Sequence, residues 1–588
     1  MARRGELSRF WLPVGVMLLF ACYVSVKLVR SHIEPEVNSI DYTFEKEVEG
    51  VRGSILDATG ATLSKSIPIW DYHLDPVALT NRVVKTKGCP PRPPAAIVKT
   101  IAQALGLDFH DLLRKSHDVK KRYQPLGKSS DPDAHRTLAD SSLVAGVVIE
   151  DCQVRQYLHH RLMSHVVGFV NREGTGSAGV ELKYNRYLAG VPGQVRGMKD
   201  AHGRELYDKR INSIDPVPGA NVQLTLDHNL QFIAEEKLRE GVREFGAGAG
   251  WCIVMNARTG AVLAMASVPD FDPLFFNTAS DAAKMNRAVA FNYEPGSVMK
   301  VITTAAAIDT GRFTPESRYN TNQYDDRYFR LPGDHGHVWE PTMTIRDGVV
   351  HSSNIVIGKL GVDLGQETLW NYQRAFGFGE TTGVGLPGEE AGILPHWKRW
   401  DKIKWSRAPI GQGVSVTAIQ LVSAYQAIAN DGVRLRPYVV ERIVEPNGNE
   451  LYRHQVERIG RPIKASTART MREVMLGVAS SAGTARRAAI RGYSIAGKTG
   501  TAEKANPNGR GYLSGLFCAT FCGIVPASDP EIVVLVTLDF DTRQKLHQGG
   551  NSAAPIWQKI TRKTLRYLMI PPDRPEELEN ADLQDDDE

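Results

Sequence analysis

A twenty-residue apolar segment near the amino terminus, Phe10 to Val29, places the strongest limit on how this chain is organised. It reads FWLPVGVMLLFACYVSVKLV and carries one charge, Lys27, close enough to its end for the amine to reach lipid headgroups. As a helix it would extend roughly 30 Å, the thickness of one hydrocarbon core. Three arginines precede it within nine residues. The positive-inside rule therefore predicts residues 1–9 in the cytoplasm and the chain after the segment on the outer side.

A cleaved signal peptide is the competing interpretation of this segment. Its apolar region would normally be shorter and would end in small residues such as Ala-x-Ala. Residues 26–30, VKLVR, offer no such cleavage site. We therefore expect a retained single-pass anchor at residues 10–29 in the cytoplasmic membrane, with the folded part of the chain in the periplasm or outside the cell.

The composition provides material for two or three packed domains, because 42% of the 588 residues are hydrophobic and 23% are charged. Global disorder and collagen-like repetition are excluded. Lys and Arg outnumber Asp and Glu by 71 to 66, but residues 571–588 alone carry a net charge of −8, which leaves +13 elsewhere. That surplus suits an anionic polymer or a membrane surface and identifies neither. We expect residues 569–588 to form an acidic, disordered tail.

Apolar periodicity predicts two folded units after the anchor. Residues 30–220 are mixed, and their first part, RGSILDATGATLSKS, reads as two short strands around a turn. The second unit begins with helical spacing from Leu226 to Phe245, followed by two apolar strands joined across Asn256–Gly260 as a hairpin. Apolar strands return only after residue 490. Strands at both ends with helices between them imply one sheet built from distant segments, an α+β domain over residues 221–568.

The six cysteines do not indicate a disulfide scaffold in a chain of this size. Cys22 lies in the apolar segment. Cys518 and Cys522 share one strand face but are separated by roughly 13 Å, too far to bridge each other. Cys89 and Cys152 could pair only if the fold brings them together.

One short segment, GDHGHVWE, offers a candidate metal site. His335 and His337 lie two residues apart beside Asp334 and could hold a metal, but a polar loop is the favoured interpretation. No cysteine or histidine spacing resembles a zinc site. We therefore expect neither a metal nor a cofactor.

The segment YEPGSVMK opens an apolar helix and places Ser297 in its first turn. Unpaired backbone N–H groups and the helix dipole favour developing negative charge there. Lys300 lies one turn further along the same face, roughly 5–6 Å away. A lysine can serve as the base for a serine nucleophile if burial and a neighbouring cation lower its pKa. An isolated Ser-x-x-Lys occurs by chance about once or twice in such a chain, and a helix cap followed by a solvated lysine explains it equally well.

A second polar cluster, HSSN, contains Ser352 and Asn354. Residues two apart face opposite sides of a helix, so both can reach one site only from a turn between helices. Ser352 could relay a proton, and the Asn354 amide could both donate to and accept from a peptide bond. The neighbouring His351 is expected to be a packing or solvent-facing residue.

A third cluster, AGKTGTA, reads as a strand. Lys498 would point to the opposite side from Thr499 and Thr501, and Gly500 would allow a substrate backbone to approach closely. An edge strand with a solvated lysine is the simpler interpretation. A Lys-Thr-Gly triplet is nevertheless expected by chance only about 0.1–0.2 times per chain, so this cluster is the most specific of the three.

Together the three motifs occur in the order typical of penicilloyl serine transferases, and the chain resembles a class B penicillin-binding protein. EPGSVMK, HSSN, AGKTGTAEK, GQGVSVTAIQLVSAYQAIANDG and HQGGNSAAPIW read as the transpeptidase domain of that family. RGSILDATGATLSKS and HVVGFVNREGTGSAGVELKYNRYLAG are similar to its amino-terminal pedestal, in which Arg52, Gly53 and Asp57 are expected to be structural. The resemblance covers residues 40–565. It implies a mixed pedestal domain and a serine β-lactamase-like domain with a central antiparallel sheet flanked by helices.

This resemblance implies a serine acyl-enzyme mechanism. Ser297 would attack the carbonyl of the penultimate D-alanine of a peptidoglycan stem, releasing the terminal D-alanine. Lys300 would take the serine proton, and Ser352 would pass a proton to the leaving amine. Asn354 would anchor both the stem amide and Lys300. An amine of a neighbouring stem then accepts the acyl group, which makes the cross-link.

Substrate binding is assigned by the same resemblance to the third motif. Lys498, with the hydroxyls of Thr499 and Thr501, would hold the terminal carboxylate. Gly500, between the two threonines, belongs to the same substrate-binding set. The backbone N–H groups of Ser297 and Thr501 would form the oxyanion hole.

Division-type and elongation-type relatives share this chemistry. Asn354 favours the division type, because elongation-type proteins often carry Asp at that position. The short pedestal and the total length agree with the division type. The Gly411–Gly413 run and the tryptophans near residue 400 give some likeness to the elongation type. A bifunctional class A enzyme is disfavoured, because residues 30–220 show no glycosyltransferase-like acidic motif.

Other functional classes are a non-catalytic β-lactam sensor or scaffold and a β-lactamase. A sensor needs a cytoplasmic output domain, for which nine residues leave no room, and an idle scaffold would tolerate loss of the motif lysines. A β-lactamase needs a water-activating base and has no use for a pedestal. The resemblance implies β-lactams as covalent inhibitors and, as partners, a membrane glycosyltransferase of the shape, elongation, division and sporulation (SEDS) family and other division proteins. No nucleic acid is expected.

Overall fold

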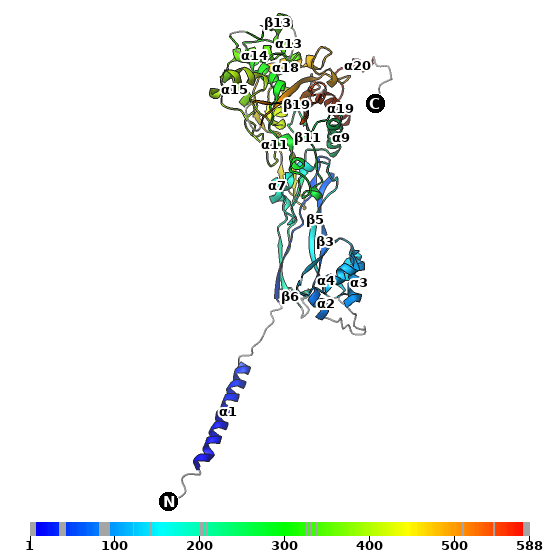
Figure 1. Cartoon of the computed structure of the whole chain (residues 1–588), viewed down its shortest axis with the longest axis vertical. Helices are drawn as coiled ribbons and strands as arrows, with labels where there is room; N and C mark the ends of the chain where they lie inside the picture. The colour runs from blue at the N-terminus through cyan, green and yellow to red at the C-terminus, as the bar shows by residue number, and fades with distance from the viewer. Residues whose placement is uncertain are drawn as a thin grey trace. The chain divides into compact units, whose positions relative to one another are not determined.

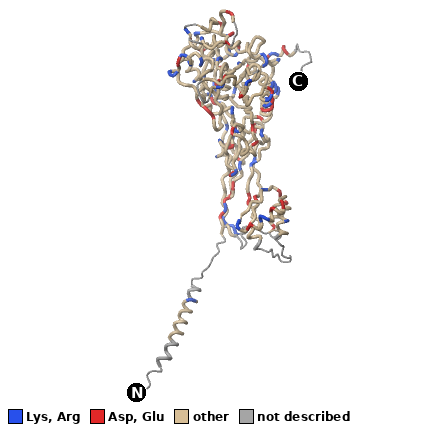
Figure 2. The backbone as a smooth tube through the Cα atoms, viewed as in Figure 1, with Lys and Arg blue, Asp and Glu red and all other residues tan. Residues whose placement is uncertain are grey.

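The structure is a computed structural model, and it divides into two compact units, residues 1–49 with 192–216 and residues 50–191 with 217–588. The residues that it describes are 7–33, 43–81, 94–121, 123–140, 144, 146–199, 205–206, 209–324, 327–328, 331–334, 339–506, 511–544 and 547–579. Cys89, His335 and His337 lie outside the described residues. Lys and Arg are interspersed with Asp and Glu along the described chain (Figure 2).

The first unit contains helix α1 (Leu7–Ile33) and a four-stranded antiparallel sheet. The sheet strands are β1 (Thr43–Val48), β6 (Gly193–Lys199), β7 (Glu205–Leu206) and β8 (Asn212–Ile214). The apolar segment Phe10–Val29 lies within α1, whose side chains are described at residues 15–28. No helix among the described residues is apolar over a length sufficient to cross a membrane.

A seven-stranded sheet dominates the amino-terminal part of the second unit. β3 and β5 pair over eleven positions, from Ser64 opposite Tyr157 to Leu74 opposite Val147. The strand order β16-β15-β9-β2-β3-β4, with β5 also on β3, crosses the predicted domain boundary at residue 220. The strands are β2 (Ile55–Leu56), β3 (Thr62–Leu74), β4 (Gln124–Ser129), β5 (Val147–Tyr157), β9 (Asn221–Leu224), β15 (Val440–Val444) and β16 (Glu450–Arg453).

Short helices accompany this sheet. One group packs with β3 around a separate small core that includes Tyr72, Ile101 and Leu112. The helices of the group are α2 (Pro76–Asn81), α3 (Pro94–Leu105), α4 (Phe109–Ser116) and α5 (Pro132–Ala139). A second group comprises α6 (Ser164–Val167), α7 (Gly179–Lys183) and α8 (Asn185–Leu188).

Arg52, expected to be structural, belongs to a buried ion-pair network. Its Nε donates to Glu181 Oε2 at 2.7 Å, and Arg155 Nε donates to Glu181 Oε1 at 2.7 Å. Gly53 lies against the backbone, where a Cβ would come within 2.0 Å of the Ala220 carbonyl oxygen. These contacts agree with a structural role for both Arg52 and Gly53.

The carboxy-terminal part of the second unit contains a five-stranded antiparallel sheet in the order β11-β10-β20-β19-β18. The predicted hairpin is confirmed, because β10 (Ala249–Asn256) pairs with β11 (Val262–Val268). β10 also pairs with β20 (Ile532–Asp539), which confirms that distant segments form one sheet. β19 (Tyr512–Val525) separates β20 from β18 (Ala496–Ala505), which lies at one edge.

Helices cover this sheet on both faces. Every residue of β20 is buried, and successive strand residues point to opposite faces, so neither face is exposed to water. α9 (His228–Phe245) and α19 (Ala553–Tyr567) lie side by side against the sheet, as Figure 1 shows. α17 (Ala418–Ala429) and α18 (Ala465–Leu476) also contact sheet strands.

The remaining elements surround the predicted motifs. The helices are α10 (Asp281–Lys284), α11 (Arg287–Ala290), α12 (Lys300–Asp309), α13 (Ile345–Val350), α14 (Asn354–Leu364), α15 (Gln366–Ala375), α16 (Lys402–Arg407) and α20 (Glu576–Glu579). The strands are β12 (Arg318–Asn320), β13 (Thr342–Thr344), β14 (Arg434–Leu435) and β17 (Arg458–Gly460). Short 3-10 helices are η2 (Pro273–Phe275), η3 (Gly296–Met299), η4 (Trp397–Arg399), η5 (Ala408–Ile410), η6 (Gly477–Ala479) and η7 (Arg486–Ala488).

Residues 569–579 differ from the expected disordered tail. They include helix α20, and the Asp573 carboxylate accepts hydrogen bonds from the Ser494 N–H at 2.8 Å and from the Ser528 hydroxyl at 2.5 Å. The expectation rested on local acidic composition. Hydrogen bonds to residues far away in the sequence hold this segment in place instead.

Candidate active site

A pocket of about 450 Å³ contains residues from all three predicted motifs. It lies beside the edge strand β18, the 3-10 helix η3 and the turn between α13 and α14. Among its lining residues are Ser297, Ser352, Asn354, Thr499 and Thr501. More than 200 positions separate the first from the last of these, so the fold alone brings them together.

Ser297 lies in η3, one turn before α12 begins, and is half-buried. The sequence predicted the first turn of a helix here, and the structure has a tighter 3-10 turn that runs directly into α12. Gly296 has a φ of +55°, and its N–H donates to the Gly411 carbonyl at 3.1 Å. A Cβ on Gly411 would approach the Gly296 oxygen to 2.2 Å, so this turn needs a glycine as its neighbour.

Lys300 is fully buried at the start of α12. Its Nζ donates to Asn354 Oδ1 at 2.7 Å, to Ser352 Oγ at 3.2 Å and to the Ser352 carbonyl oxygen. Burial lowers the pKa of Lys300 to about 7, while the negative charge of Asp334 acts in the opposite direction. An amine with this pKa is substantially uncharged at neutral pH and can accept a proton.

Ser352 lies in the turn between α13 and α14, and Asn354 is the first residue of α14, so the predicted turn between helices is present. Ser352 adopts a left-handed conformation with a φ of +61°, which turns the chain between the two helices. Asn354 Oδ1 accepts from Lys300, and Asn354 Nδ2 donates to the Gly333 carbonyl at 2.9 Å. His351 lines the same pocket, and its ring lies 5.3 Å from the Trp339 ring.

β18 presents alternate side chains as predicted, with Thr499 and Thr501 in the pocket wall and Lys498 fully buried. Lys498 Nζ donates to the Thr499 carbonyl at 3.3 Å and reaches its hydroxyl at 3.5 Å. Burial, assisted by the positive charge of Lys300, lowers the pKa of Lys498 well below its ordinary value. Lys498 is therefore not the solvated lysine of the simpler interpretation.

Gly500 allows a close contact inside the protein, and its predicted closeness to a substrate backbone stays a prediction. A Cβ at this position would meet the Pro295 carbonyl oxygen at 3.0 Å and Val298 Cγ1 at 3.2 Å. Gly500 thus allows β18 to pack closely against the segment that carries Ser297, and it is not among the residues that line the pocket. Strand alternation explains this result, because Gly500 faces the same side as the buried Lys498.

Asp334 belongs to this site, although sequence reasoning considered it only as a companion of two histidines. It lines the pocket and is 8% exposed. Its carboxylate accepts hydrogen bonds from residues 353–355 at the start of α14. No local pattern marks it, since it lies nineteen residues before its nearest partner in the motif. Glu503 and His547 also line the pocket, and the strand alternation beyond Thr501 could have indicated Glu503.

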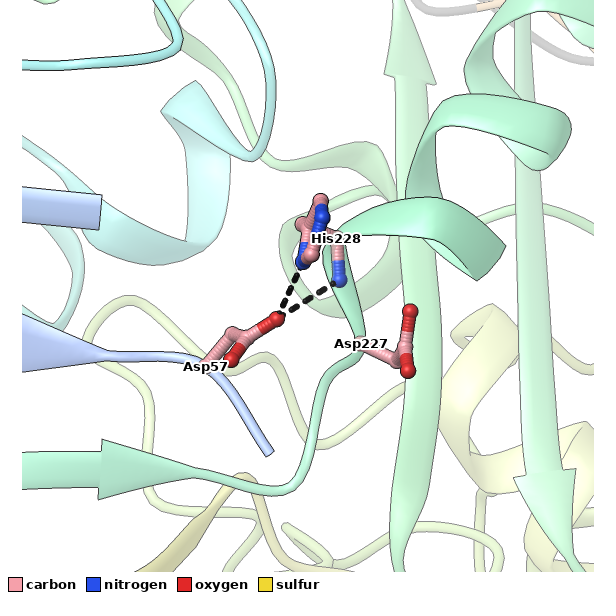
Figure 3. A group of neighbouring side chains, drawn as sticks. All are labelled: Asp57, Asp227 and His228. Atoms are coloured by element: carbon pink, nitrogen blue, oxygen red, sulfur yellow. Dashed lines mark hydrogen bonds and ion pairs between the residues drawn. The ribbon is translucent and has the colours of Figure 1, made fainter. Parts of the chain in front are cut away.

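A second group of ligand-type side chains, Asp57, Asp227 and His228, lies outside this pocket (Figure 3). Their oxygen and nitrogen atoms lie within 4.8 Å of one another, a separation compatible with a metal ion. Hydrogen bonds occupy these atoms instead: Asp57 accepts from the His228 N–H at 3.2 Å and binds its ring, and Asp227 accepts from the Tyr567 hydroxyl at 2.8 Å. The group joins the β2–β3 turn to the start of α9, as a structural role of Asp57 requires.

Two family models match the chain. The model of the penicillin binding protein transpeptidase domain matches residues 250–562, which is more than half of the chain, and the penicillin-binding protein dimerisation domain matches residues 47–224. The first match includes all three motifs and the five-stranded sheet. The second includes Arg52, Gly53 and Asp57.

Named relatives and solved structures are similar along most of their length. The probable peptidoglycan D,D-transpeptidase PenA of Neisseria gonorrhoeae is 30% identical, covering 98% of this chain and 95% of that protein. The peptidoglycan D,D-transpeptidase FtsI of Escherichia coli (strain K12) is also 30% identical, covering 90% and 85%. The crystal structure of penicillin binding protein 3 from Mycobacterium tuberculosis with aztreonam has a TM-score of 0.67 and 28% identity, covering 90% of this chain and 99% of that one.

Proposed function

This chain belongs to the class B penicillin-binding protein family, and we propose that Ser297 is the nucleophile with which it cross-links peptidoglycan stem peptides. The observation that carries the proposal is the buried amine of Lys300, with a pKa of about 7, held by the second motif next to the segment that bears Ser297. A base of this kind gives a serine hydroxyl useful nucleophilicity at neutral pH.

In the proposed acylation, Ser297 Oγ forms a bond to the carbonyl carbon of the penultimate D-alanine. Its proton passes to neutral Lys300, and the amide C–N bond breaks. The leaving amine of the terminal D-alanine takes up a proton, and the Ser352 hydroxyl, 3.2 Å from Lys300 Nζ, is placed to relay it. Asn354, which accepts from the same amine, holds the base in position.

The third motif is proposed to bind the terminal carboxylate of the stem. Thr499 and Thr501 offer hydroxyl groups to the pocket, and Lys498 lies directly behind them. The low pKa of Lys498 reflects burial and the nearby positive charge of Lys300, and among the described residues no salt bridge pairs this amine with a carboxylate. An arriving carboxylate would favour the protonated amine and so supply the missing counter-charge. Gly500 contributes close packing between this strand and the segment before Ser297.

The oxyanion is proposed to be stabilised by the backbone N–H groups of Ser297 and Thr501. Each such donor typically lowers the barrier by about 3–4 kcal/mol. The acyl-enzyme is then resolved by an amine of a second stem, which attacks the ester carbonyl, loses a proton to the base and releases the Ser297 hydroxyl. The product is a new amide cross-link.

The location and partners form a further part of the proposal. The apolar sequence of Phe10–Val29, preceded by three arginines, supports a single-pass membrane anchor with the pocket on the outer side. Asn354 and the similarity to FtsI support a role at the division septum, with a SEDS-family glycosyltransferase and other division proteins as partners. Depletion in the native organism tests the role, because filaments indicate division and rounded cells indicate side-wall elongation.

Fluorescent penicillin labelling followed by peptide mass spectrometry tests the central proposal. We expect a persistent adduct on Ser297 that Ser297→Ala abolishes. Substitution of the exposed Ser480 by Ala should leave labelling unchanged. An adduct on another side chain would contradict the assignment.

Two other results would point to different functional classes. Rapid turnover of penicillin would indicate a β-lactamase, since it requires fast hydrolysis of the acyl-enzyme. Stable labelling without release of D-alanine from a stem peptide would indicate a sensor or scaffold.

A further inference from the structure

Asp334 makes an unusual number of hydrogen bonds for one side chain. Its Oδ1 accepts the N–H groups of Asn354 at 2.6 Å and Ile355 at 3.3 Å. Its Oδ2 accepts the Ser353 hydroxyl at 2.6 Å and the Trp339 indole N–H at 2.9 Å. The carboxylate thus occupies the amino end of α14, where free N–H groups and the helix dipole favour an anion.

These bonds hold the turn that presents the second motif to Lys300. Asn354 is bound on three sides: its N–H donates to Asp334, its Nδ2 donates to the adjoining Gly333 carbonyl, and its Oδ1 accepts from Lys300. Ser353 is the cap of α14, with its Oγ accepting the Val356 N–H at 3.1 Å. A shift of the Asp334 carboxylate would therefore displace Asn354 Oδ1, the acceptor that positions the buried Lys300 amine.

Charge provides a second, independent link between Asp334 and the amine. The negative charge of Asp334 favours the protonated form of Lys300. The positive charge of Lys300 in turn disfavours protonation of Lys498. His351, Glu503 and His547 line the same pocket. Asp334 is 8% exposed, so water screens its charge only weakly.

We propose that Asp334 is a positioning residue for the acylation step, acting through Lys300 in two ways. Three of its four hydrogen bonds hold residues 353–355 at the start of α14, and its charge raises the pH at which the Lys300 amine becomes free to accept a proton. This inference rests on the proposed function, because it assumes that Lys300 is the base for Ser297. Asp334 itself transfers no proton and touches no reacting atom.

The test measures the rate of penicillin acylation between pH 5 and pH 9 in the full chain. Asp334→Asn removes the charge and turns one acceptor into a donor. In a plot of acylation rate against pH, the acid limb is the part at low pH where the rate rises. We expect this limb in Asp334→Asn to shift to lower pH by about one unit, because an anion no longer favours protonated Lys300. The rate on the high-pH plateau should fall at least about tenfold, because donors at the start of α14 lose their partner.

Two variants separate the charge from the geometry. Asp334→Glu keeps the charge but moves it by one methylene, so the limb should stay within about 0.3 pH units of the wild type while the plateau falls. Ser353→Ala removes one hydrogen bond to Asp334 and leaves the carboxylate in place, with the same expectation. A merely structural residue would lower the plateau in all three variants and move the limb in none.

Each outcome decides the inference. It is overturned if Asp334→Asn keeps the wild-type limb, or if Asp334→Glu keeps the wild-type plateau rate within twofold. The Glu variant alone still tests the hydrogen bonds if the Asn variant does not fold. Failure of the proposed function looks different, because the wild type would then form no adduct on Ser297 at any pH.

Discussion

Two fully buried lysines, Lys300 and Lys498, dominate the electrostatics of the site. Lys300 hydrogen-bonds to Ser352 and Asn354, whereas within the described part of the chain Lys498 reaches only the Thr499 carbonyl and hydroxyl. Neither amine has a carboxylate within ion-pair distance among the described residues. Burial disfavours the charged form of both, which lowers both pKa values. A group of opposite charge that enters this site meets amines ready to take a proton.

The pKa of Lys300 predicts the pH dependence of acylation. The neutral amine is the reactive form, and burial lowers its pKa from 10.5 to about 7. The acylation rate should therefore rise about tenfold per pH unit below pH 7 and level off above it. Stopped-flow measurement with a chromogenic β-lactam checks this. His351→Gln and His547→Gln, which each remove an imidazole from the pocket lining, should retain the limb. Loss of the limb in either variant would assign it to histidine.

At the scale of elements, local signals predicted the site elements well. The segment YEPGSVMK correctly indicated a helix that starts near Ser297, and the spacing of Ser352 and Asn354 indicated a turn between helices. Alternation along β18 separated Lys498 from the two threonines. In each case the structural cause lies within a few residues of the motif.

Features that depend on distant contacts could not be predicted in this way. The role of Gly500 follows from its approach to Pro295, and that of Asp334 from hydrogen bonds to a helix that begins twenty residues later. β15 and β16 join the amino-terminal sheet from beyond residue 439, which no local pattern indicates. Each of these contacts joins residues that are distant in the sequence, so it can be seen only once the tertiary fold is known.

The contact between η3 and η5 gives a prediction at this scale. Gly411 has a φ of +80° and lies against the backbone of Gly296. The Cβ of an alanine at position 411 would come within 2.2 Å of the Gly296 carbonyl oxygen. Gly411→Ala should displace the segment that carries Ser297 and lower the penicillin acylation rate at least about a hundredfold, because misplacement by 1 Å can have that effect.

Gly413→Ala is the matched control for this substitution. Gly413 also has a positive φ, +72°, but its Cβ would meet only the flexible Lys404 side chain, at 3.1 Å. Both variants should lose about 1–2 kcal/mol of stability from backbone strain. Only Gly411→Ala should lose acylation. Equal rates in the two variants would show that the position of Ser297 does not depend on Gly411.

At the scale of the second unit, the pedestal segment and the transpeptidase segment are joined by shared structure. The seven-stranded sheet takes strands from both, and Asp57 binds the start of α9 (Figure 3). A second junction lies about two helical turns after His228 in α9, where Glu235 accepts hydrogen bonds from the Met163 N–H at 2.9 Å and from the Gln231 amide at 2.8 Å. These bonds make the stability of the two segments interdependent.

The carboxyl group of Glu235 makes this junction sensitive to pH. Burial raises its pKa from 4.5 to about 7, so between these values the folded chain holds a proton that the unfolded chain has lost. The resulting contribution to the free energy of unfolding is fully present below pH 4.5 and is lost as the pH rises to 7, a change of about 3 kcal/mol. Glu235→Gln mimics the protonated group. The variant should therefore match the wild type near pH 5 and have a higher thermal midpoint near pH 8. Glu236→Gln, on the partly exposed side of the same helix, should show no such change between the two pH values. If the difference between Glu235→Gln and the wild type is the same at both pH values, the Glu235 carboxyl group does not titrate with the raised pKa.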